Sequence, residues 1–359
     1  MSEHKKICHF TSAHEQCDDR IYLKECISLV NAGYEVYIVA RGETQNLNGI
    51  NIIGCGVQKG RLGRIFGFSK KVYKTAKKLN CDVYHFHDPE LLPYAVKLKK
   101  AGKKVIFDSH EDVPAQILDK EWIPFPFRKL ISIIYKKYET YAVRQFDAVI
   151  TATSHIAEQF EGRTKKVVVI NNYPKLDDII FQTKPFEDRD KIVCYAGGIS
   201  EIRGEKVMVE AMKSVDGKLI LAGESDSINN IIRDNIVYLG KINRTKVNEL
   251  YGNARCGLVL YQPAKNHFEA QPIKMFEYMA AGLPFVASDF PLWKKIVSEN
   301  ECGICVPPSD IESVKKACIL LLENPVKSQE MGKKGRELVM GKYNWDVEEK
   351  KLIELYKEI

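Results

Sequence analysis

Long hydrophobic runs are absent from this sequence of 359 residues. Its longest apolar stretches, such as residues 148–152 and 257–261, are far shorter than the roughly 20 residues that a membrane-spanning helix needs. The first residues, Met-Ser-Glu-His-Lys-Lys, are polar and lack the apolar core of a secretory signal. We therefore expect a cytoplasmic protein without a transmembrane segment.

Two common nucleotide-binding signatures are also missing. The segment after the first predicted strand reads Thr-Ser-Ala-His (11–14), where a dinucleotide-binding dehydrogenase would carry G-x-G-x-x-G. No Walker A sequence occurs, so a P-loop NTPase is not expected either.

The cysteine pattern predicts neither a disulfide framework nor a zinc site. The ten cysteines are spread over the whole chain, and several (Cys8, Cys194, Cys256) lie within apolar runs, where a thiol packs as a small hydrophobic group. Cys302 and Cys305 form a lone C-x-x-C without the second pair that a four-ligand zinc site would need.

Acidic residues are missing from residues 59–78, which contain eight Lys and Arg. Residues 1–180 hold 28 basic and 21 acidic residues, so this part carries the whole net charge of +7. Such a basic segment favours an anionic partner, which could be a phospholipid, a nucleic acid or a phosphorylated substrate.

What is present is a regular alternation of strands and helices. Hydrophobic residues make up 45% of the chain, as in globular proteins, and at about 150 residues per domain the length predicts two domains. The alternation predicts mostly parallel sheets covered on both faces. The expected strands are 6–10, 35–40, 50–55, 82–87, 104–109, 148–153, 167–171, 192–196, 219–222, 236–239, 258–261, 284–288 and 303–306.

The alternation is interrupted at Asn172-Tyr173-Pro174 and resumes after residue 190. We therefore expect an N-terminal domain of residues 1–173 and a C-terminal domain of residues 174–344. Residues 345–359 form a helical pattern with an apolar stripe, which we expect to cross back and pack on the first domain. In such α/β domains ligands bind at the carboxyl ends of the strands.

The most specific segment is residues 269–284, Glu-Ala-Gln-Pro-Ile-Lys-Met-Phe-Glu-Tyr-Met-Ala-Ala-Gly-Leu-Pro. It places Glu269 before a predicted helix and Glu277 eight residues later, inside the helix. Carboxylates in this position can accept hydroxyls of a polyol, while helix N–H groups face a phosphate. An isolated pair with this spacing is usually a surface acid and a packing acid, so the flanking residues carry the argument.

With these flanking residues, the sequence resembles the retaining family 4 glycosyltransferases of GT-B fold over essentially the whole chain. The resemblance implies an α/β protein of two doubly wound, Rossmann-like domains facing across a cleft. It implies metal-independent transfer of a sugar, with retention, from a nucleotide sugar to a saccharide or lipid-linked acceptor in polysaccharide or glycoconjugate synthesis. UDP is the expected nucleotide, and no cofactor is expected.

The resemblance also implies roles for the residues of this segment. Glu269 is expected near the donor sugar and Glu277 at the ribose hydroxyls. The Pro-x-Lys variant of the motif places Lys274 before the Phe-Glu-Tyr-Met, where it would supply a cation to the diphosphate.

A second match is residues 195–204, Tyr-Ala-Gly-Gly-Ile-Ser-Glu-Ile-Arg-Gly, between a predicted strand and a helix. Family members often carry Arg where this chain has Gly198, and Lys where it has Arg203, so one usual cation is absent. Gly197, Gly198 and Gly204 are expected to bind the donor and Arg203 its pyrophosphate. Gly223 falls where another loop meets the nucleotide.

Histidines gather at strand ends of the first domain, as His85-Phe-His87-Asp and Asp-Ser-His110-Glu-Asp. Strand alternation puts His85 and His87 on one face, where imidazoles could bind a metal. The resemblance favours no metal, a structural role for His85, and a catalytic contact of His110 with the donor sugar or acceptor.

The loop after the first strand resembles the acceptor-side loop of the family. It contains His14, Asp18 and Arg20, whose individual roles stay open.

Two alternatives remain open at this stage. A nucleotide-sugar 2-epimerase of GT-B architecture would share the fold, although residues 269–284 fit the transferase better. A non-catalytic nucleotide-sugar-binding subunit would account for Gly198 in place of the usual Arg.

Residues 61–71 and 122–141 interleave cations with aromatic and aliphatic residues. Segments of this kind bind anionic bilayers, so a peripheral association with the inner face of the plasma membrane is expected. A solvated basic face over a core helix is the simpler alternative. No nucleic-acid motif accompanies the charge, and no nucleic-acid partner is expected.

Overall fold

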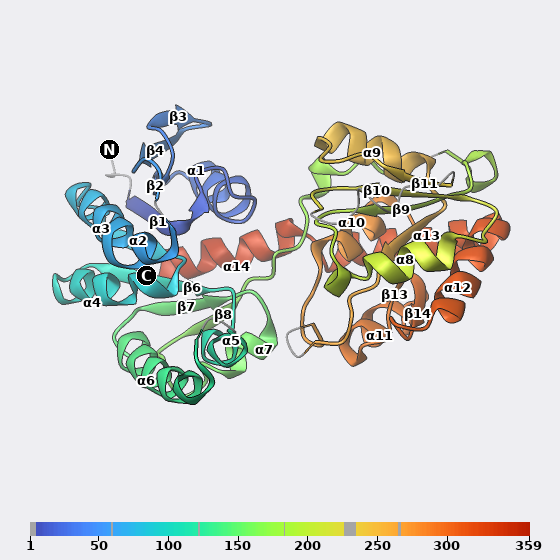
Figure 1. Ribbon diagram of the computed structural model, residues 1–359. Helices are drawn as coiled ribbons and strands as arrows, with labels where there is room; N and C mark the ends of the chain where they lie inside the picture. Colours follow the sequence, from blue (N-terminus) through green and yellow to red (C-terminus); the bar gives the residue numbers. More distant parts are fainter. Residues whose placement is uncertain (1–4, 59, 121–122, 183, 226–234, 265–266) are drawn as a thin grey trace. The chain divides into compact units, whose positions relative to one another are not determined.

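The computed structural model describes residues 5–58, 60–120, 123–182, 184–225, 235–264 and 267–359. Lys59 and Trp122, at the starts of the basic and aromatic segments, lie outside these ranges. The chain forms two compact units (Figure 1): unit 1 comprises Met1–Asn172 and Glu348–Ile359, and unit 2 comprises Tyr173–Val347.

Among the described residues, no helix has both the length and the apolar character that crossing a membrane would require.

Unit 1 is built on an eight-stranded sheet with the order β3-β4-β2-β1-β5-β6-β7-β8. Its neighbouring strands are parallel except for β3 and β4, which are antiparallel. The strands are β1 (Lys6–Glu15), β2 (Glu35–Arg41), β3 (Gln45–Leu47), β4 (Ile50–Gly54), β5 (Val83–Phe86), β6 (Lys104–Ser109), β7 (Ala148–Thr151) and β8 (Val167–Val169).

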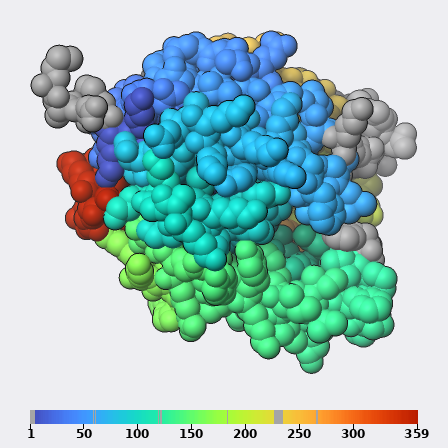
Figure 2. Space-filling view, turned by 90° about the vertical axis from the view of Figure 1, so that its left-hand side faces the viewer, coloured from blue at the N-terminus to red at the C-terminus, as the bar shows by residue number. Residues whose placement is uncertain are grey.

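Helices flank this sheet (Figure 1). They are η1 (Ile21–Cys26), α1 (Ile27–Asn31), α2 (Gly60–Gly63), η2 (Arg64–Phe68), α3 (Ser69–Lys78), η3 (Pro89–Leu91), α4 (Leu92–Lys100), α5 (Val113–Asp119), α6 (Phe125–Val143), α7 (Ser154–Glu158) and the greater part of α14 (Trp345–Glu358). Figure 2 shows the face on which α3, α4 and α6 lie side by side, in light blue, cyan and green.

Strand alternation gives the unit 1 sheet two different faces. Phe10 and Tyr84 point into an apolar core shared with α3 and α4. His9 and His85 point to the other face, where Glu25 of η1 and Tyr356 of α14 contact them. This second face therefore carries fully buried polar side chains beside apolar ones such as Ile7 and Val83.

The end of the chain belongs to unit 1. Leu352, Leu355 and Tyr356 of α14 are at most 1% exposed. Glu348 accepts a hydrogen bond of 2.9 Å from the backbone N–H of Asn171. The apolar stripe of residues 345–359 thus supplies part of the unit 1 interior from Glu348 onward.

Unit 2 has a six-stranded, fully parallel sheet with the order β11-β10-β9-β12-β13-β14. The strands are β9 (Ile192–Ala196), β10 (Lys218–Ala222), β11 (Ile236–Tyr238), β12 (Cys256–Val259), β13 (Phe285–Ser288) and β14 (Gly303–Val306). The helices are η4 (Leu176–Asp178), η5 (Phe186–Asp188), η6 (Glu201–Arg203), α8 (Glu205–Met212), α9 (Arg244–Asn253), α10 (Ile273–Ala281), α11 (Pro291–Val297), α12 (Ile311–Glu323) and α13 (Pro325–Gly341).

Both faces of the unit 2 sheet are covered by apolar cores, as a parallel sheet requires. Along β9, Val193 and Tyr195 enter one core and Cys194 and Ala196 enter the other. Polar side chains are therefore left to the loops at the carboxyl ends of the strands.

Candidate functional site

A cavity of about 390 Å³ opens in unit 2 at the carboxyl ends of β9, β10 and β11. Three of the expected donor-binding glycines (Gly197, Gly198 and Gly223) line it together with Glu277. The remaining lining residues are Ala196, Ala222, Glu224, Lys241, Ile242, Arg244, Val247 and Tyr251. The structure thus brings two glycine loops and one of the paired carboxylates to a single site.

Glu277 lies in the second turn of α10 and is only 9% exposed. Its Oε1 accepts a hydrogen bond of 2.7 Å from Arg244 Nη2, and its Oε2 accepts one of 3.0 Å from the Tyr251 hydroxyl. Burial and the neighbouring carboxylate raise the pKa of Tyr251 well above its usual range, so the hydroxyl stays a donor. The Glu277 carboxylate is therefore fixed at the cavity wall.

Two cations border the Gly197–Gly198 loop. Arg203, at the end of η6, donates a hydrogen bond of 3.2 Å from Nη1 to the Gly198 carbonyl. Lys274 Nζ lies 3.5 Å from the centre of the Tyr195 ring and has no hydrogen-bond partner among the described residues. Burial and the charge of Arg203 lower the pKa of Lys274 well below its usual range. An anion bound beside the loop would relieve both effects.

The Arg203 side chain explains why residue 198 can be glycine. A Cβ atom added at Gly198 would lie 2.4 Å from Arg203 Nη1, so the guanidinium already occupies the space beside this position. Arg203 thus brings a cation to the place where the resemblance had led us to expect the side chain of residue 198.

Backbone contacts hold the two glycine loops together. Gly223 has a φ of +142°, and a Cβ atom there would lie 1.9 Å from the Gly197 carbonyl oxygen. A larger residue at this position would therefore force the loops apart and reshape the cavity.

Four of the expected unit 2 residues do not line the cavity. Arg203 and Lys274 border the Gly197–Gly198 loop, and the other two lie elsewhere. Glu269 sits on an exposed turn four residues before the start of α10, and Gly204 precedes α8 against the Leu260 backbone. Gly204 therefore serves helix packing in this structure, and Glu269 faces solvent.

In unit 1, the structure brings His14, Asp18 and His110 together. His14 Nδ1 lies 3.1 Å from Asp18 Oδ2, and the rings of His14 and His110 pack edge to face with centroids 5.6 Å apart. Burial opposes protonation of His14, but Asp18 and nearby carboxylates raise its pKa overall. Asp18 also accepts backbone hydrogen bonds from Arg20 and Ile21, so it fixes the start of η1.

Arg20 has a buried structural position. It is 5% exposed, and its Nε and Nη2 donate to the two oxygens of Asp108 at 2.9 and 3.1 Å. Its Nη1 donates to the Ile170 carbonyl at 2.9 Å. Burial alone would raise the pKa of Asp108, but the charges of Arg20 and His110 hold it well below its usual range. Arg20 thus neutralises the carboxylate beside which His110 lies.

Sequence reasoning missed several residues of these two sites. Arg244 and Tyr251 come from α9, and their only signal was the Gly240-Lys241 turn just before that helix. Glu25 and Tyr356 lie among apolar helical positions and gave no signal of a polar cluster.

Both halves of the chain match models of glycosyltransferase families. Residues 177–338 match the family described as Glycosyl transferases group 1, and residues 23–173 match Glycosyltransferase Family 4. The chain combines a family 4 domain with a group 1 glycosyltransferase domain. The group 1 match lies within unit 2, and the family 4 match lies almost entirely within unit 1.

Solved structures with this fold are similar over nearly the whole chain. A sucrose-phosphate synthase from Thermosynechococcus elongatus has 18% identity and a TM-score of 0.76, with 99% of this chain and 98% of that chain covered. HepE of Anabaena in complex with UDP-glucose has 14% identity and a TM-score of 0.73, with 99% and 100% covered. The fold is therefore GT-B, with two Rossmann-like domains.

The curated relatives match a smaller part of the chain. A phosphatidyl-myo-inositol mannosyltransferase of Mycobacterium leprae is 27% identical over 56% of this chain and 56% of its own. An uncharacterized glycosyltransferase of Methanocaldococcus jannaschii is 24% identical over 48% of this chain and 46% of its own. The chain thus spans about half the length of the curated relatives it matches.

Proposed function

We propose that the protein is a retaining, metal-independent glycosyltransferase that takes its sugar from a nucleotide sugar with UDP as the nucleotide. The observation that carries this proposal is the unit 2 cavity, where glycine loops, the Arg244–Glu277–Tyr251 cluster and two bordering cations meet. A structure of HepE with UDP-glucose, which shares the fold, supports a nucleotide sugar as the donor.

In this proposal the cavity divides into a ribose end and a phosphate end. Glu277 accepts the ribose hydroxyls, since Arg244 and Tyr251 hold its oxygens at the wall. The backbone of Gly197 and Gly198 approaches the diphosphate together with Arg203 and Lys274. The attraction between these side chains and the diphosphate increases as the leaving group becomes more negative. It therefore stabilises the transition state more than the bound substrate.

The acceptor is a saccharide or a lipid-linked saccharide in polysaccharide or glycoconjugate synthesis, and unit 1 binds it. The polar groups of the acceptor contact His14, Asp18 and His110. Arg20 positions the loop after β1 through its bond to Asp108. His110 contacts the donor sugar or the acceptor, and Glu269 orients the donor sugar from its turn. The acceptor attacks on the face from which the diphosphate leaves, and the departing phosphate oxygen takes the acceptor proton.

Donor binding and turnover test the proposal. UDP or a UDP-sugar at 100 times its dissociation constant should stabilise the protein by about 2.7 kcal/mol, since only the folded state binds it. Slow hydrolysis of the matching UDP-sugar should accompany this binding. Glu277→Gln should weaken both, whereas Glu249→Gln, an exposed position on α9, should change neither. Absence of any nucleotide-dependent shift or turnover would contradict the proposal.

The same assay separates the alternatives. A 2-epimerase converts UDP-N-acetylglucosamine into a different nucleotide sugar without an acceptor, and a non-catalytic subunit binds the donor without consuming it. We expect neither outcome. The proposed transferase should instead consume the UDP-sugar slowly and release free sugar and UDP.

Helix α6 supports a peripheral membrane association of unit 1. Apolar residues usually face the core, but Phe125 is 83% exposed and Ile134 57% exposed. Eight large apolar residues on this helix are exposed: Phe125, Phe127, Leu130, Ile131, Ile133, Ile134, Tyr138 and Tyr141. Exposed Lys129, Lys136 and Lys137 alternate with them, which suits an anionic bilayer.

We expect unit 1 to bind anionic vesicles in a salt-sensitive way. Each cation near such a surface contributes about 1 kcal/mol, so replacing Lys136 and Lys137 by Glu should lower the binding constant at least about 30-fold. Lys295→Glu, an exposed position of unit 2, is the matched control. Co-sedimentation at low salt measures the effect, and a wild-type protein that stays in the supernatant would refute the association.

A further inference from the structure

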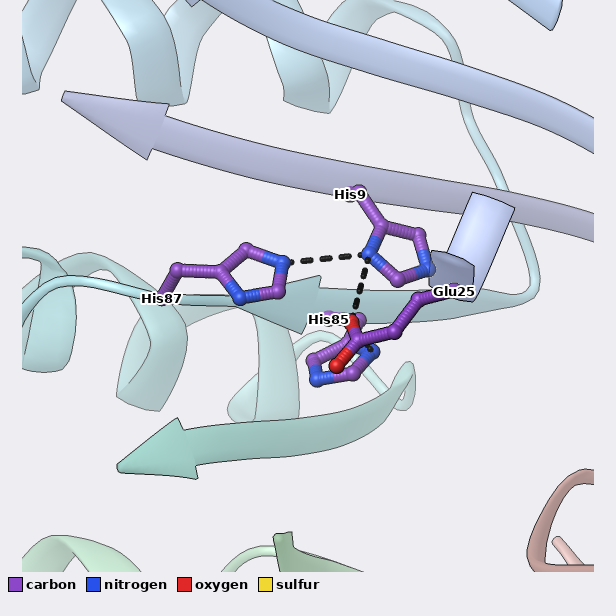
Figure 3. Close-up of side chains that lie close together, drawn as sticks. All are labelled: His9, Glu25, His85 and His87. Atoms are coloured by element: carbon purple, nitrogen blue, oxygen red, sulfur yellow. Dashed lines mark hydrogen bonds and ion pairs between the residues drawn. The ribbon is translucent and has the colours of Figure 1, made fainter. Parts of the chain in front are cut away.

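Three histidines and one glutamate converge inside unit 1 (Figure 3). They are His9 of β1, His85 of β5, His87 just after β5, and Glu25 of η1. One potential ligand atom of each lies within 4.8 Å of the others. His9, Glu25 and His85 are 0% exposed and His87 is 3% exposed.

We propose that His9, Glu25, His85 and His87 bind a zinc ion that holds the buried face of the unit 1 sheet to η1. Imidazole nitrogen and carboxylate oxygen are both zinc ligands, and a site with four protein ligands and no open position is of the structural kind. The sequence led us to expect no metal, at His85 and His87 included; the convergence of His9 and Glu25 on these two residues, which the sequence did not reveal, is the reason for proposing one.

The distances are close to those of a tetrahedral site. With metal–ligand bonds of about 2.0–2.2 Å, neighbouring ligand atoms lie roughly 3.3 Å apart. His9 Nδ1 and His87 Nε2 are 3.1 Å apart, and His9 Nδ1 is 3.7 Å from Glu25 Oε2. His85 Nδ1 is 4.0 Å from the same oxygen but bonds the Tyr356 hydroxyl at 2.8 Å, so His85 must give up this bond or turn its Nε2 inward to become the fourth ligand.

Two outer groups orient the imidazoles toward the centre. Asp108 Oδ2 lies 3.3 Å from His87 Nδ1, so a proton on this nitrogen leaves Nε2 free as a ligand. The Tyr356 hydroxyl lies 3.2 Å from His9 Nε2 and, in the same way, leaves Nδ1 free. Metal-binding histidines generally have such partners on the second nitrogen.

Hydrogen bonds alone leave part of the cluster without partners. A chain from His85 through Tyr356, His9 and His87 toward Asp108 can account for most imidazole nitrogens. Among the described residues, however, neither Glu25 oxygen nor His85 Nε2 makes a hydrogen bond. Arg20 Nε lies 3.1 Å from Glu25 Oε1 but is shared with Asp108, and Oε2 faces only the histidines. A buried carboxyl group without hydrogen bonds is costly, and a cation among the imidazoles removes this cost.

A second group of potential ligands, His87, Asp108 and His110, shares His87 with the first. Arg20 bonds both oxygens of Asp108 but contacts Glu25 through Oε1 alone, which leaves Oε2 toward the histidines, so the first group is the better site for a cation.

Metal analysis of the purified full-length protein tests the proposal. Protein grown with added zinc should retain about one zinc per chain after dialysis. Replacement of zinc by cobalt(II) should give the visible absorption bands of tetrahedral coordination. Protein that is folded but holds no metal, or cobalt without these bands, would overturn the proposal in favour of the hydrogen-bonded chain.

Variants locate the metal without depending on activity. Glu25→Gln should abolish stoichiometric zinc, and Tyr356→Phe, which keeps the ring, should weaken binding about 10- to 100-fold. His155→Asn, which changes a half-exposed side chain of α7, is the control and should retain the ion. Full zinc content in a folded Glu25→Gln protein would place the metal elsewhere and refute this site. A failure here would leave the donor-binding results of unit 2 unchanged, so the two proposals fail separately.

Discussion

Replacing Arg203 by Ala is expected to lower kcat for sugar transfer about 100-fold or more, in addition to weakening donor binding. The guanidinium borders the Gly197–Gly198 loop, and its charge acts most strongly when the sugar–phosphate bond breaks. Steady-state kinetics with the donor identified by the binding screen measure the change. Lys206→Ala, which removes an exposed cation from the adjoining α8, should leave kcat unchanged.

The two glutamates of the E-x7-E segment should respond differently from Arg203. Glu277→Gln should mainly raise the donor KM, because the ribose that Glu277 is proposed to hold does not change during transfer. Glu269→Gln should lower kcat more than Glu277→Gln does. If folded Glu277→Gln loses more kcat than both Arg203→Ala and Glu269→Gln, the proposed roles are inverted.

Replacing Arg20 by Ala is expected to destabilise the protein by about 3–5 kcal/mol. The substitution leaves Asp108, which is 0% exposed, without the cation that contacts both of its oxygens. Denaturant unfolding at neutral pH measures the loss. Arg41→Ala is the matched control, since its pair with Glu15 is exposed and should contribute only about 0–1 kcal/mol.

The pH dependence of this loss identifies its cause. In the wild type the pKa of Asp108 is depressed, so its contribution is full above the unfolded pKa and fades as the pH falls through the folded value. In the variant, protonation of Asp108 at low pH removes the unpaired charge. The difference between the two proteins should therefore shrink as the pH falls toward about 4. A difference that is independent of pH would instead indicate lost packing.

Much of the fold could be predicted because its signals are local. The strands Lys104–Ser109, Ile192–Ala196 and Gly303–Val306 have the bounds that were predicted, because each is built around a short apolar run. β3 was missed because this short edge strand is fully exposed and has no apolar alternation to reveal it. The π-helical form of η1 could not be predicted either, because side-chain periodicity does not distinguish it from the α-helix that follows it.

The candidate sites could likewise be predicted only where their signals are local. Glycines at strand ends and the spacing of Glu269 and Glu277 are visible in the sequence, so the loops of the cavity could be named in advance. The partners of Glu277 could not, because Arg244 and Tyr251 reach it from a helix 26 or more residues away along the chain. Buried pairs depend on the tertiary structure, and a single sequence does not reveal them.

The position of α14 has a consequence for synthesis on the ribosome. Unit 2 is one continuous segment, whereas unit 1 needs Glu348–Ile359, which are translated after all of unit 2. Until these residues emerge, Asn171 lacks its Glu348 partner and the histidines of β1 and β5 lack Tyr356. Unit 1 is therefore translated first but can finish folding only after unit 2 has been translated. The exposed apolar and basic residues of α6 leave the ribosome before the interior of unit 1 is closed.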